Sequence, residues 1–277
     1  MKVNEIITNE IIESLSKEII PWQKPWNSIA PKNIVTNREY SGFNKLYLGT
    51  LPYKFPYFAT FKQVKAKGGS IKKGAKSEIC IFWNIKERQV ENKNGKIETK
   101  KFPLLRYFKV FNVEYIEGIE FDKELFETNE IENNEIADNI INNYLDNESI
   151  EIKNGSNASY NPVSDFITMP SKEIFTSRSG YYSTLFHEMA HSTGHKNRLN
   201  RLEATKFGTE KYAKEELVAE ITSCFLCGKT GMKKESIENT KAYCQSWIKA
   251  LKDDKNMIIS AAGMAEKAEN FIVNGEK

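Results

Sequence analysis

The sequence predicts an α+β protein of two domains. Hydrophobic residues make up 40% of the 277 residues and charged residues 28%, which is enough apolar material for one large or two ordinary cores and excludes a disordered chain. Strand-like runs and helical periodicity both occur, and the strand signals are concentrated in the first part of the chain.

The charge is also unevenly distributed. Residues 1–118 hold 21 Lys and Arg against 11 Asp and Glu, residues 119–151 hold one against 11, and residues 152–277 hold 18 against 15. We therefore expect domains at 1–118 and 152–277, joined by an acidic linker at 119–151 that carries partial helical periodicity. A basic first block favours a polyanionic partner, because clustered cations release counterions from phosphates.

The first domain is expected to combine helices with a small antiparallel sheet. Apolar residues recur at helical spacing from Glu5 to Ile20, and Pro21 stops that pattern. Asn94-Gly95 is typical of a hairpin turn between two strands. The expected helices are 5–20, 44–49 and 60–67, and the expected strands are 78–83 and 102–113.

The second domain is expected to be mainly helical with a short sheet. A strand at 166–169 is ended by Pro170, and its open edge could pair with an extended peptide. Apolar periodicity predicts helices at 181–191, 213–226, 242–252 and 259–272.

The three histidines of the chain lie within nine residues, which favours a shared metal-binding role. His187-Glu188-Met189-Ala190-His191 is an H-E-x-x-H motif on an apolar helix, where side chains four residues apart lie about 6 Å from each other. Both imidazoles could then bind one ion, and Glu188 would take a proton from water and pass it to a leaving amine. The structural alternative is a helix with two packed histidines and a surface glutamate.

The third ligand has two candidates. His195 follows Gly194, which is typical of a helix end and would turn the His195 ring away. Glu216 shares a helix face with Glu220, so Glu216 could bind the ion while Glu220 accepts the N–H of a ligand histidine. Glu215 is the fallback, and a solvated helix face is the structural alternative for all these glutamates.

Several motifs in the same order resemble the ArdC-type antirestriction proteins of plasmids and phages. In the second half they are Tyr182 to His195, Arg198-Leu199-Asn200-Arg201 and Tyr212 to Cys227. In the first half they are Pro21-Trp22-Gln23-Lys24-Pro25-Trp26, Tyr40-Ser41-Gly42-Phe43-Asn44, Thr60-Phe61-Lys62-Gln63 and Phe111-Asn112-Val113.

The resemblance implies an N-terminal domain that binds single-stranded DNA and a C-terminal zincin-like metallopeptidase domain of the Glu-zincin type. It also implies a role in protecting incoming mobile DNA from host restriction. The ligands of one divalent ion would be His187, His191 and Glu216, with Glu220 as the helix neighbour of Glu216 that supports a ligand histidine. The ion would be Zn²⁺ first, with Mn²⁺ or Co²⁺ as alternatives. The expected partners are single-stranded DNA and an unidentified protein or peptide substrate.

Cations alternate with aromatic residues in the first block, as in proteins that hold phosphates and stack bases. We expect Trp22 and Trp26 on their proline-rich turn to contact DNA in preference to strand aromatics, which more often belong to a sheet core. The expected DNA contacts are Trp22, Lys24, Trp26, Arg38, Asn44, Lys62, Lys72, Lys73, Lys76 and Arg106.

Composition favours a cytoplasmic protein with no membrane association. No run reaches 18 apolar residues, the N-terminus lacks a signal-peptide pattern, and four cysteines are too few for a disulfide framework. A rival hypothesis is a non-catalytic protein that coats DNA and carries a structural ion. A secreted protease or toxin is disfavoured.

Overall fold

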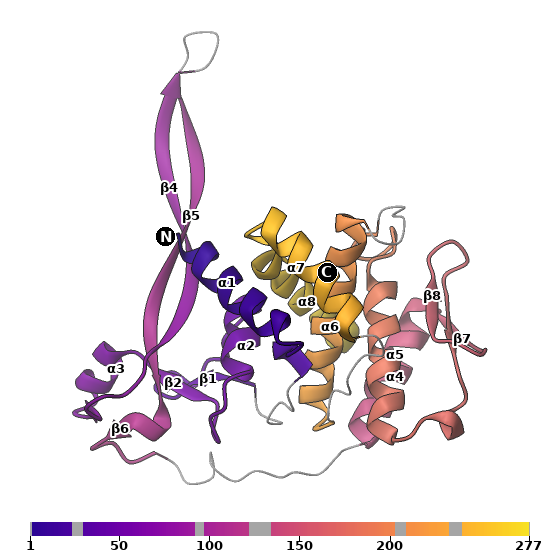
Figure 1. Cartoon of the computed structure of the whole chain (residues 1–277), viewed down its shortest axis with the longest axis horizontal. Helices are drawn as coiled ribbons and strands as arrows, with labels where there is room; N and C mark the ends of the chain where they lie inside the picture. Colours follow the sequence, from indigo (N-terminus) through magenta and orange to yellow (C-terminus); the bar gives the residue numbers. More distant parts are fainter. Residues whose placement is uncertain are drawn as a thin grey trace.

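The computed structural model describes residues 2–23, 30–91, 97–121, 134–202, 209–232 and 240–276. Strands and short helices of the basic N-terminal block lie on one side, the later helices lie on the other, and α1 and α2 lie between them (Figure 1). Among the residues described, no helix is long and apolar enough to cross a membrane.

The N-terminal block contains the expected helices and a long hairpin. The helices are α1 (Val3–Ser16), α2 (Gly42–Gly49) and α3 (Phe61–Ala66), with 3₁₀ turns η1 (Pro21–Gln23) and η2 (Val113–Tyr115). The strands are β1 (Lys32–Asn33), β2 (Tyr57–Ala59), β3 (Ser70–Ile71), β4 (Glu78–Glu91), β5 (Ile97–Asn112) and β6 (Ile116–Glu117).

Local sequence explains where these elements begin and end. Thr60 caps α3, because its hydroxyl accepts a hydrogen bond from the Gln63 amide at 3.2 Å while the Gln63 side chain accepts one from the Thr60 amide at 2.9 Å. Strands β4 and β5 are longer than expected, and the predicted turn Asn94-Gly95 lies outside the described residues.

The first sheet has the strand order β1-β2-β5-β4. Strand β4 is antiparallel to β5, as expected. Strand β2, which the sequence did not predict, is also antiparallel to β5, whereas β1 is parallel to β2. Strand β2 pairs with β5 only near Phe111 and Asn112, so β4 and β5 continue beyond it as a two-stranded ribbon.

The C-terminal half is mainly helical, as predicted. Its helices are α4 (Asn134–Glu148), α5 (Arg178–Thr193), α6 (Glu210–Lys229), α7 (Thr240–Asp253) and α8 (Met257–Asn274). Its other elements are strands β7 (Glu151–Asn154), β8 (Ser159–Asn161) and β9 (Phe166–Met169) and the 3₁₀ turn η4 (Lys172–Ile174).

The expectation of an open edge on the strand at 166–169 is wrong. Strand β9 lies in the middle of its sheet, parallel to β7 on one side and antiparallel to β8 on the other. The two neighbours are short and largely polar, so the sequence gives only a weak signal for them.

The acidic segment contributes to the C-terminal core. Helix α4 buries Ala137, Ile141 and Tyr144, and the Tyr144 ring packs edge-on against Phe271 of α8 at 6.1 Å. This segment is therefore part of the C-terminal core as well as a linker. The domain boundaries 1–118, 119–151 and 152–277 remain predictions.

The largest hydrophobic cluster combines residues from both halves. Helix α1 packs on α7, and α2 packs on α8. From the N-terminal block the cluster takes Ile7, Ile11, Leu15, Ile20, Trp22, Phe43, Leu46 and Ile81, and α6 contributes Leu217, Val218, Ile221 and Phe225. The helix that carries Glu216 is therefore packed directly against the N-terminal block.

Candidate metal centre

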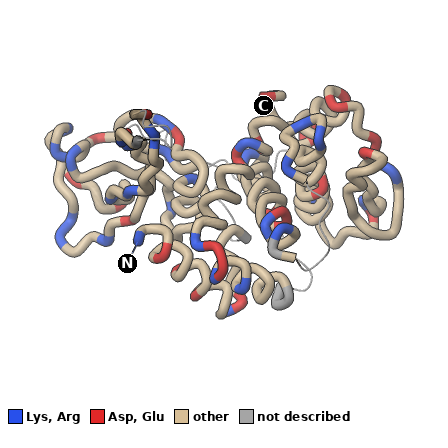
Figure 2. Tube along the Cα trace, turned by 90° about the horizontal axis from the view of Figure 1, so that it is seen from above, with Lys and Arg blue, Asp and Glu red and all other residues tan. Residues whose placement is uncertain are grey.

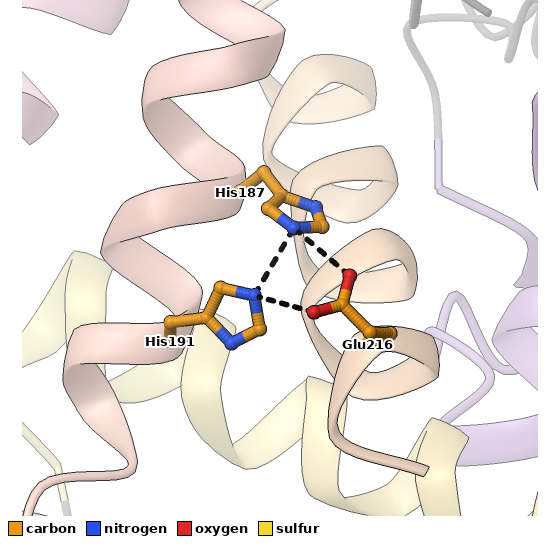
Figure 3. A group of neighbouring side chains, drawn as sticks. All are labelled: His187, His191 and Glu216. Atoms are coloured by element: carbon orange, nitrogen blue, oxygen red, sulfur yellow. Dashed lines mark hydrogen bonds and ion pairs between the residues drawn. The ribbon is translucent and has the colours of Figure 1, made fainter. Parts of the chain in front are cut away.

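The H-E-x-x-H motif lies in the last turns of α5, opposite the first half of α6 (Figure 3). The Nε2 atoms of His187 and His191 are 3.1 Å apart. One carboxylate oxygen of Glu216 lies 3.6 Å from Nε2 of His187, and the other lies 3.6 Å from Nε2 of His191. The three side chains converge closely enough to share one ion.

A second carboxylate faces the other nitrogen of each ring. The Nδ1 atom of His187 lies 2.8 Å from Glu220, and the Nδ1 atom of His191 lies 3.2 Å from Glu215. Arg201 holds Glu215 through Nε and Nη2 at 3.0 Å each, and it also donates to the Ala190 carbonyl. The ring orientations are thus fixed from α6 and from the segment after α5.

These contacts fit a divalent cation. When each Nδ1–H is donated to a carboxylate, each Nε2 carries a lone pair, and the two lone pairs converge with an anionic oxygen. Three such atoms repel one another unless a cation lies between them. Two imidazole nitrogens and one carboxylate oxygen form a donor set typical of catalytic zinc sites, which leave a position for water.

In the chain without an ion, a proton takes the place of that cation. Burial lowers the pKa of His187, but the carboxylates of Glu216 and Glu220 outweigh burial and raise the pKa to about 10. Burial raises the pKa of Glu216, but the two rings and the Tyr212 hydroxyl lower it to about 2. An ion must displace the imidazolium proton when it binds.

Glu188 lies beside the ligand group without joining it. The residue is buried, and its charge raises the pKa of His187 and of Tyr243. Among the described residues, its carboxylate has no hydrogen-bonding partner. A buried carboxylate of this kind is available to accept a proton from water.

Two tyrosines complete the surroundings of Glu216. The Tyr212 hydroxyl donates a hydrogen bond to Glu216 one helical turn away, and the Tyr243 hydroxyl of α7 is hydrogen-bonded to that of Tyr212. Burial is the main reason that the pKa of Tyr212 is raised, so its hydroxyl keeps its proton at neutral pH.

His195 is not part of the ligand group formed by the described residues. Helix α5 ends at Thr193, and Gly194 follows as its C-cap. The His195 Nδ1 atom accepts a hydrogen bond from the Asn197 amide at 3.3 Å and lies 4.0 Å from Asp165. These contacts hold the His195 ring outside the ligand group.

Sequence reasoning missed the roles of Glu215, Arg201 and Tyr212. Helical spacing does place Tyr212 one turn before Glu216. It places Glu215 on a neighbouring face from Glu216, and nothing in the spacing shows that Arg201 reaches Glu215 from the segment after α5.

One predicted DNA contact, Trp22, is wrong, and a second, Asn44, has its side-chain amide engaged within the protein. Trp22 is fully buried, with its ring edge-on to Trp247 at 5.2 Å, so it has no face on which a base could stack. The side-chain amide of Asn44 forms two hydrogen bonds with the Ile81 backbone. Nδ2 donates to the Ile81 carbonyl and Oδ1 accepts from the Ile81 amide, each at 2.8 Å. Asn44 thus fastens α2 to the edge of β4.

The remaining predicted contacts are exposed or lie outside the described residues. Lys24 and Trp26 belong to residues 24–29, which lie outside the described part. The exposed ones are Arg38, Lys62, Lys72, Lys73, Lys76 and Arg106. Lys72 donates to the Glu114 carbonyl at 2.8 Å. Figure 2 shows Lys and Arg spread over the N-terminal block, with Asp and Glu among them both there and on the later helices.

Family models match both halves of the chain. Residues 1–111 match the N-terminal domain of anti-restriction factor ArdC, and residues 137–264 match a zincin-like metallopeptidase domain. Two solved structures of the antirestriction ArdC protein from R388 plasmid are similar at 32% identity. The metal-free form has a TM-score of 0.81 and covers 100% of both chains; the Mn(II)-bound form has a TM-score of 0.77 and covers 98% of this chain and 97% of its own.

Similar sequences also occur in longer proteins. A DNA primase TraC of Escherichia coli is 33% identical over 297 residues, which cover 99% of this chain and 27% of TraC. The chain therefore spans about a quarter of that relative's length. The uncharacterized protein y4eC of Sinorhizobium fredii is 28% identical over 284 residues, which cover 98% of this chain and 91% of y4eC.

Proposed function

This chain belongs to the ArdC-type family of antirestriction proteins, and on that premise we propose that it binds single-stranded DNA and hydrolyses peptide bonds at a metal site. DNA binding belongs to the basic N-terminal half and hydrolysis to the C-terminal half. In the cytoplasm the protein protects incoming mobile DNA from host restriction. The similarity to the ArdC protein of a plasmid supports this role.

The convergence of His187, His191 and Glu216 is the observation that carries the catalytic part of the proposal. Their ligand atoms all lie within 4.8 Å of one another, and each ring is oriented by a further carboxylate. The Mn(II)-bound form of the R388 protein supports a divalent ion. We take Zn²⁺ as the first choice because the donor set is two imidazoles and one carboxylate, with Mn²⁺ or Co²⁺ as alternatives.

The protein's own groups have separate tasks in this chemistry. A bound divalent ion would polarise the scissile carbonyl and lower the pKa of a water molecule. Glu188 accepts the proton of the attacking water and returns it to the leaving amine. Glu215 and Glu220 keep each imidazole in the tautomer that presents Nε2.

A Glu188→Gln substitution tests this assignment. Because Glu188 moves protons and does not hold the ion, the variant should retain wild-type metal content while its hydrolysis of fluorescein-labelled casein falls by about 10²- to 10⁴-fold. His195→Ala, a change beside the same helix outside the ligand group, serves as the control and should keep both properties.

The rival function is a protein that coats DNA and uses its ion only to stabilise the fold. If wild-type protein and Glu188→Gln show the same casein hydrolysis at equal metal content, the catalytic role of Glu188 is contradicted. Equal protection of DNA by both proteins, with no hydrolysis by either, would favour the binding-only function.

A further inference from the structure

The ribbon formed by β4 and β5 projects from the N-terminal body (Figure 1). From the pair Phe82–Arg106 to the pair Glu91–Ile97, the two strands pair only with each other. Most of their side chains are exposed on both faces, and Leu105 near the base packs against the main hydrophobic cluster. A free two-stranded ribbon is marginally stable, so large apolar residues exposed on it indicate a binding surface.

The two faces of this ribbon differ in charge. Cross-strand partners and alternate residues share a face, which puts four exposed cations and two exposed phenylalanine rings on one side. We call them the basic hairpin face: Phe82, Lys86, Arg88, Lys100, Phe102 and Arg106. Among the described residues, none of its four cations is paired with a carboxylate.

The opposite face carries fewer cations. Among the described side chains it carries Lys101 and Lys109 against Glu87, and Lys101 lies 3.5 Å from Glu87. The basic hairpin face has a single carboxylate neighbour toward the tip, Glu98, opposite Val90. The net positive charge of the described residues is therefore larger on the basic hairpin face than on the opposite face.

Exposed rings lie among these cations. Phe82 is 42% exposed and Phe102 is 46% exposed. The Phe82 ring rests against Phe108 at 6.0 Å, and Phe108 packs on the small core formed by Leu48, Phe58, Cys80 and Val110. The base of the face is therefore anchored, and Asn44 fastens the adjoining strand at Ile81.

We propose that the basic hairpin face binds a single strand of nucleic acid, with its cations on the phosphates and Phe82 and Phe102 stacked on bases. This inference rests on the proposed DNA binding and names its location. A polyanion with exposed flat apolar faces matches the alternation of unpaired cations and rings. In a duplex the bases are stacked inside, so the rings would have nothing to contact.

The charge contribution is tested with two matched double variants of the full chain. Arg88→Gln/Lys100→Gln removes a cross-strand pair from the basic hairpin face, and Lys101→Gln/Lys109→Gln removes two charges from the opposite face. Binding of fluorescein-labelled oligothymidylate is followed by anisotropy as salt is raised. The first variant should bind at least tenfold more weakly, with a salt slope smaller by about 1.4, because each contact contributes about 0.7. The control should stay within twofold.

The rings are tested in the same way. Phe82→Thr/Phe102→Thr should lower single-strand affinity by about tenfold or more and leave the salt slope unchanged. Trp83→Thr/Tyr107→Thr, which removes two exposed rings from the opposite face, should bind like wild type. Binding of a duplex should be equal for all the ring variants.

The outcomes separate this inference from the proposed function. If wild-type protein does not bind the oligonucleotide at all, the proposed DNA binding fails. If it binds, and the basic-face variants bind as tightly as wild type or no more weakly than their opposite-face controls, only the location fails. Wild-type binding to phosphatidylserine vesicles in preference to oligonucleotide would also overturn the inference. Circular dichroism melting curves confirm that each variant is folded.

Discussion

Glu220 and Glu215 govern which nitrogen of each histidine is free to bind an ion. Each carboxylate lies next to an Nδ1 atom, at 2.8 Å from His187 and at 3.2 Å from His191. A proton held on Nδ1 leaves Nε2 as the acceptor, and both Nε2 atoms face Glu216. The geometry of the proposed ligand group therefore depends on two carboxylates outside that group.

We expect Zn²⁺ affinity to fall most in Glu216→Ala, less in Glu215→Ala and least in His195→Ala. Glu216→Ala removes a proposed ligand and should weaken Zn²⁺ binding most, whereas Glu215→Ala removes a ring support and should cost about 10- to 100-fold. His195→Ala should have little effect. Competition with a chromophoric chelator measures the affinities. A larger loss for His195→Ala than for Glu216→Ala would give the third ligand position to His195.

Among single residues of the site, the sequence predicts those that are one helical turn apart and misses Arg201, which comes from another segment. His187, His191, Glu216 and Glu220 follow from helical spacing because each pair is one turn apart. Glu215 depends on Arg201, which approaches from the irregular segment after α5. Spacing along a helix carries no information about a side chain that arrives from outside it.

At the scale of elements, one arginine ties the end of α5 to two neighbouring elements. Arg198 donates to both carboxylate oxygens of Asp165 at 2.8 and 2.9 Å, to Glu148 of α4 at 3.0 Å, and to the Ser192 carbonyl at 2.8 Å. Ser192 follows His191 directly, so this network supports the helix turn that carries a proposed ligand.

The ion pair between Asp165 and Arg198 makes the free energy of unfolding depend on pH at acidic pH. Burial raises the pKa of Asp165, but the hydrogen bonds from Arg198 and Tyr160 outweigh burial and lower the pKa below its ordinary value. The stabilisation is present above the unfolded pKa of about 3.9 and is lost as pH falls through the lower folded value. Between pH 5 and 3, wild type should lose more free energy of unfolding than Asp165→Asn in urea unfolding, by up to about 1 kcal/mol, because the pair is partly exposed and screened by solvent. Equal losses in both proteins would contradict this role.

Aromatic residues show where prediction from sequence ends. A tryptophan on a proline-rich turn was expected to be exposed and aromatics in strands to be buried, yet Trp22 is 0% exposed and Trp83 is 53% exposed. Burial of Trp22 depends on α7, about 220 residues later, and exposure of Trp83 depends on the ribbon having no neighbouring sheet. Periodicity defines a face but does not identify what covers it.

At the scale of the whole molecule, the two halves share their stability. A buried ion pair joins Lys45 of α2 to Glu269 of α8 at 2.5 Å, and the Gly42 amide donates to Glu266 at 2.9 Å. Residues 1–118 alone would expose Trp22 and the apolar side of α1, which the full chain buries against α6, α7 and α8. DNA binding should therefore be measured on the full chain.

Metal binding should stabilise both halves together, because α6 carries Glu216 on one side and Leu217, Val218 and Phe225 in the shared core on the other. At an ion concentration of about 100 times Kd, the free energy of unfolding should rise by about 2.7 kcal/mol, which corresponds to an increase in Tm of about 5–10 °C. Calorimetry with and without a chelator should show one transition that moves as a whole, and tryptophan fluorescence from the Trp22–Trp247 contact should follow the same curve. Two transitions, of which only one responds to the ion, would mean that the halves unfold independently despite their common core.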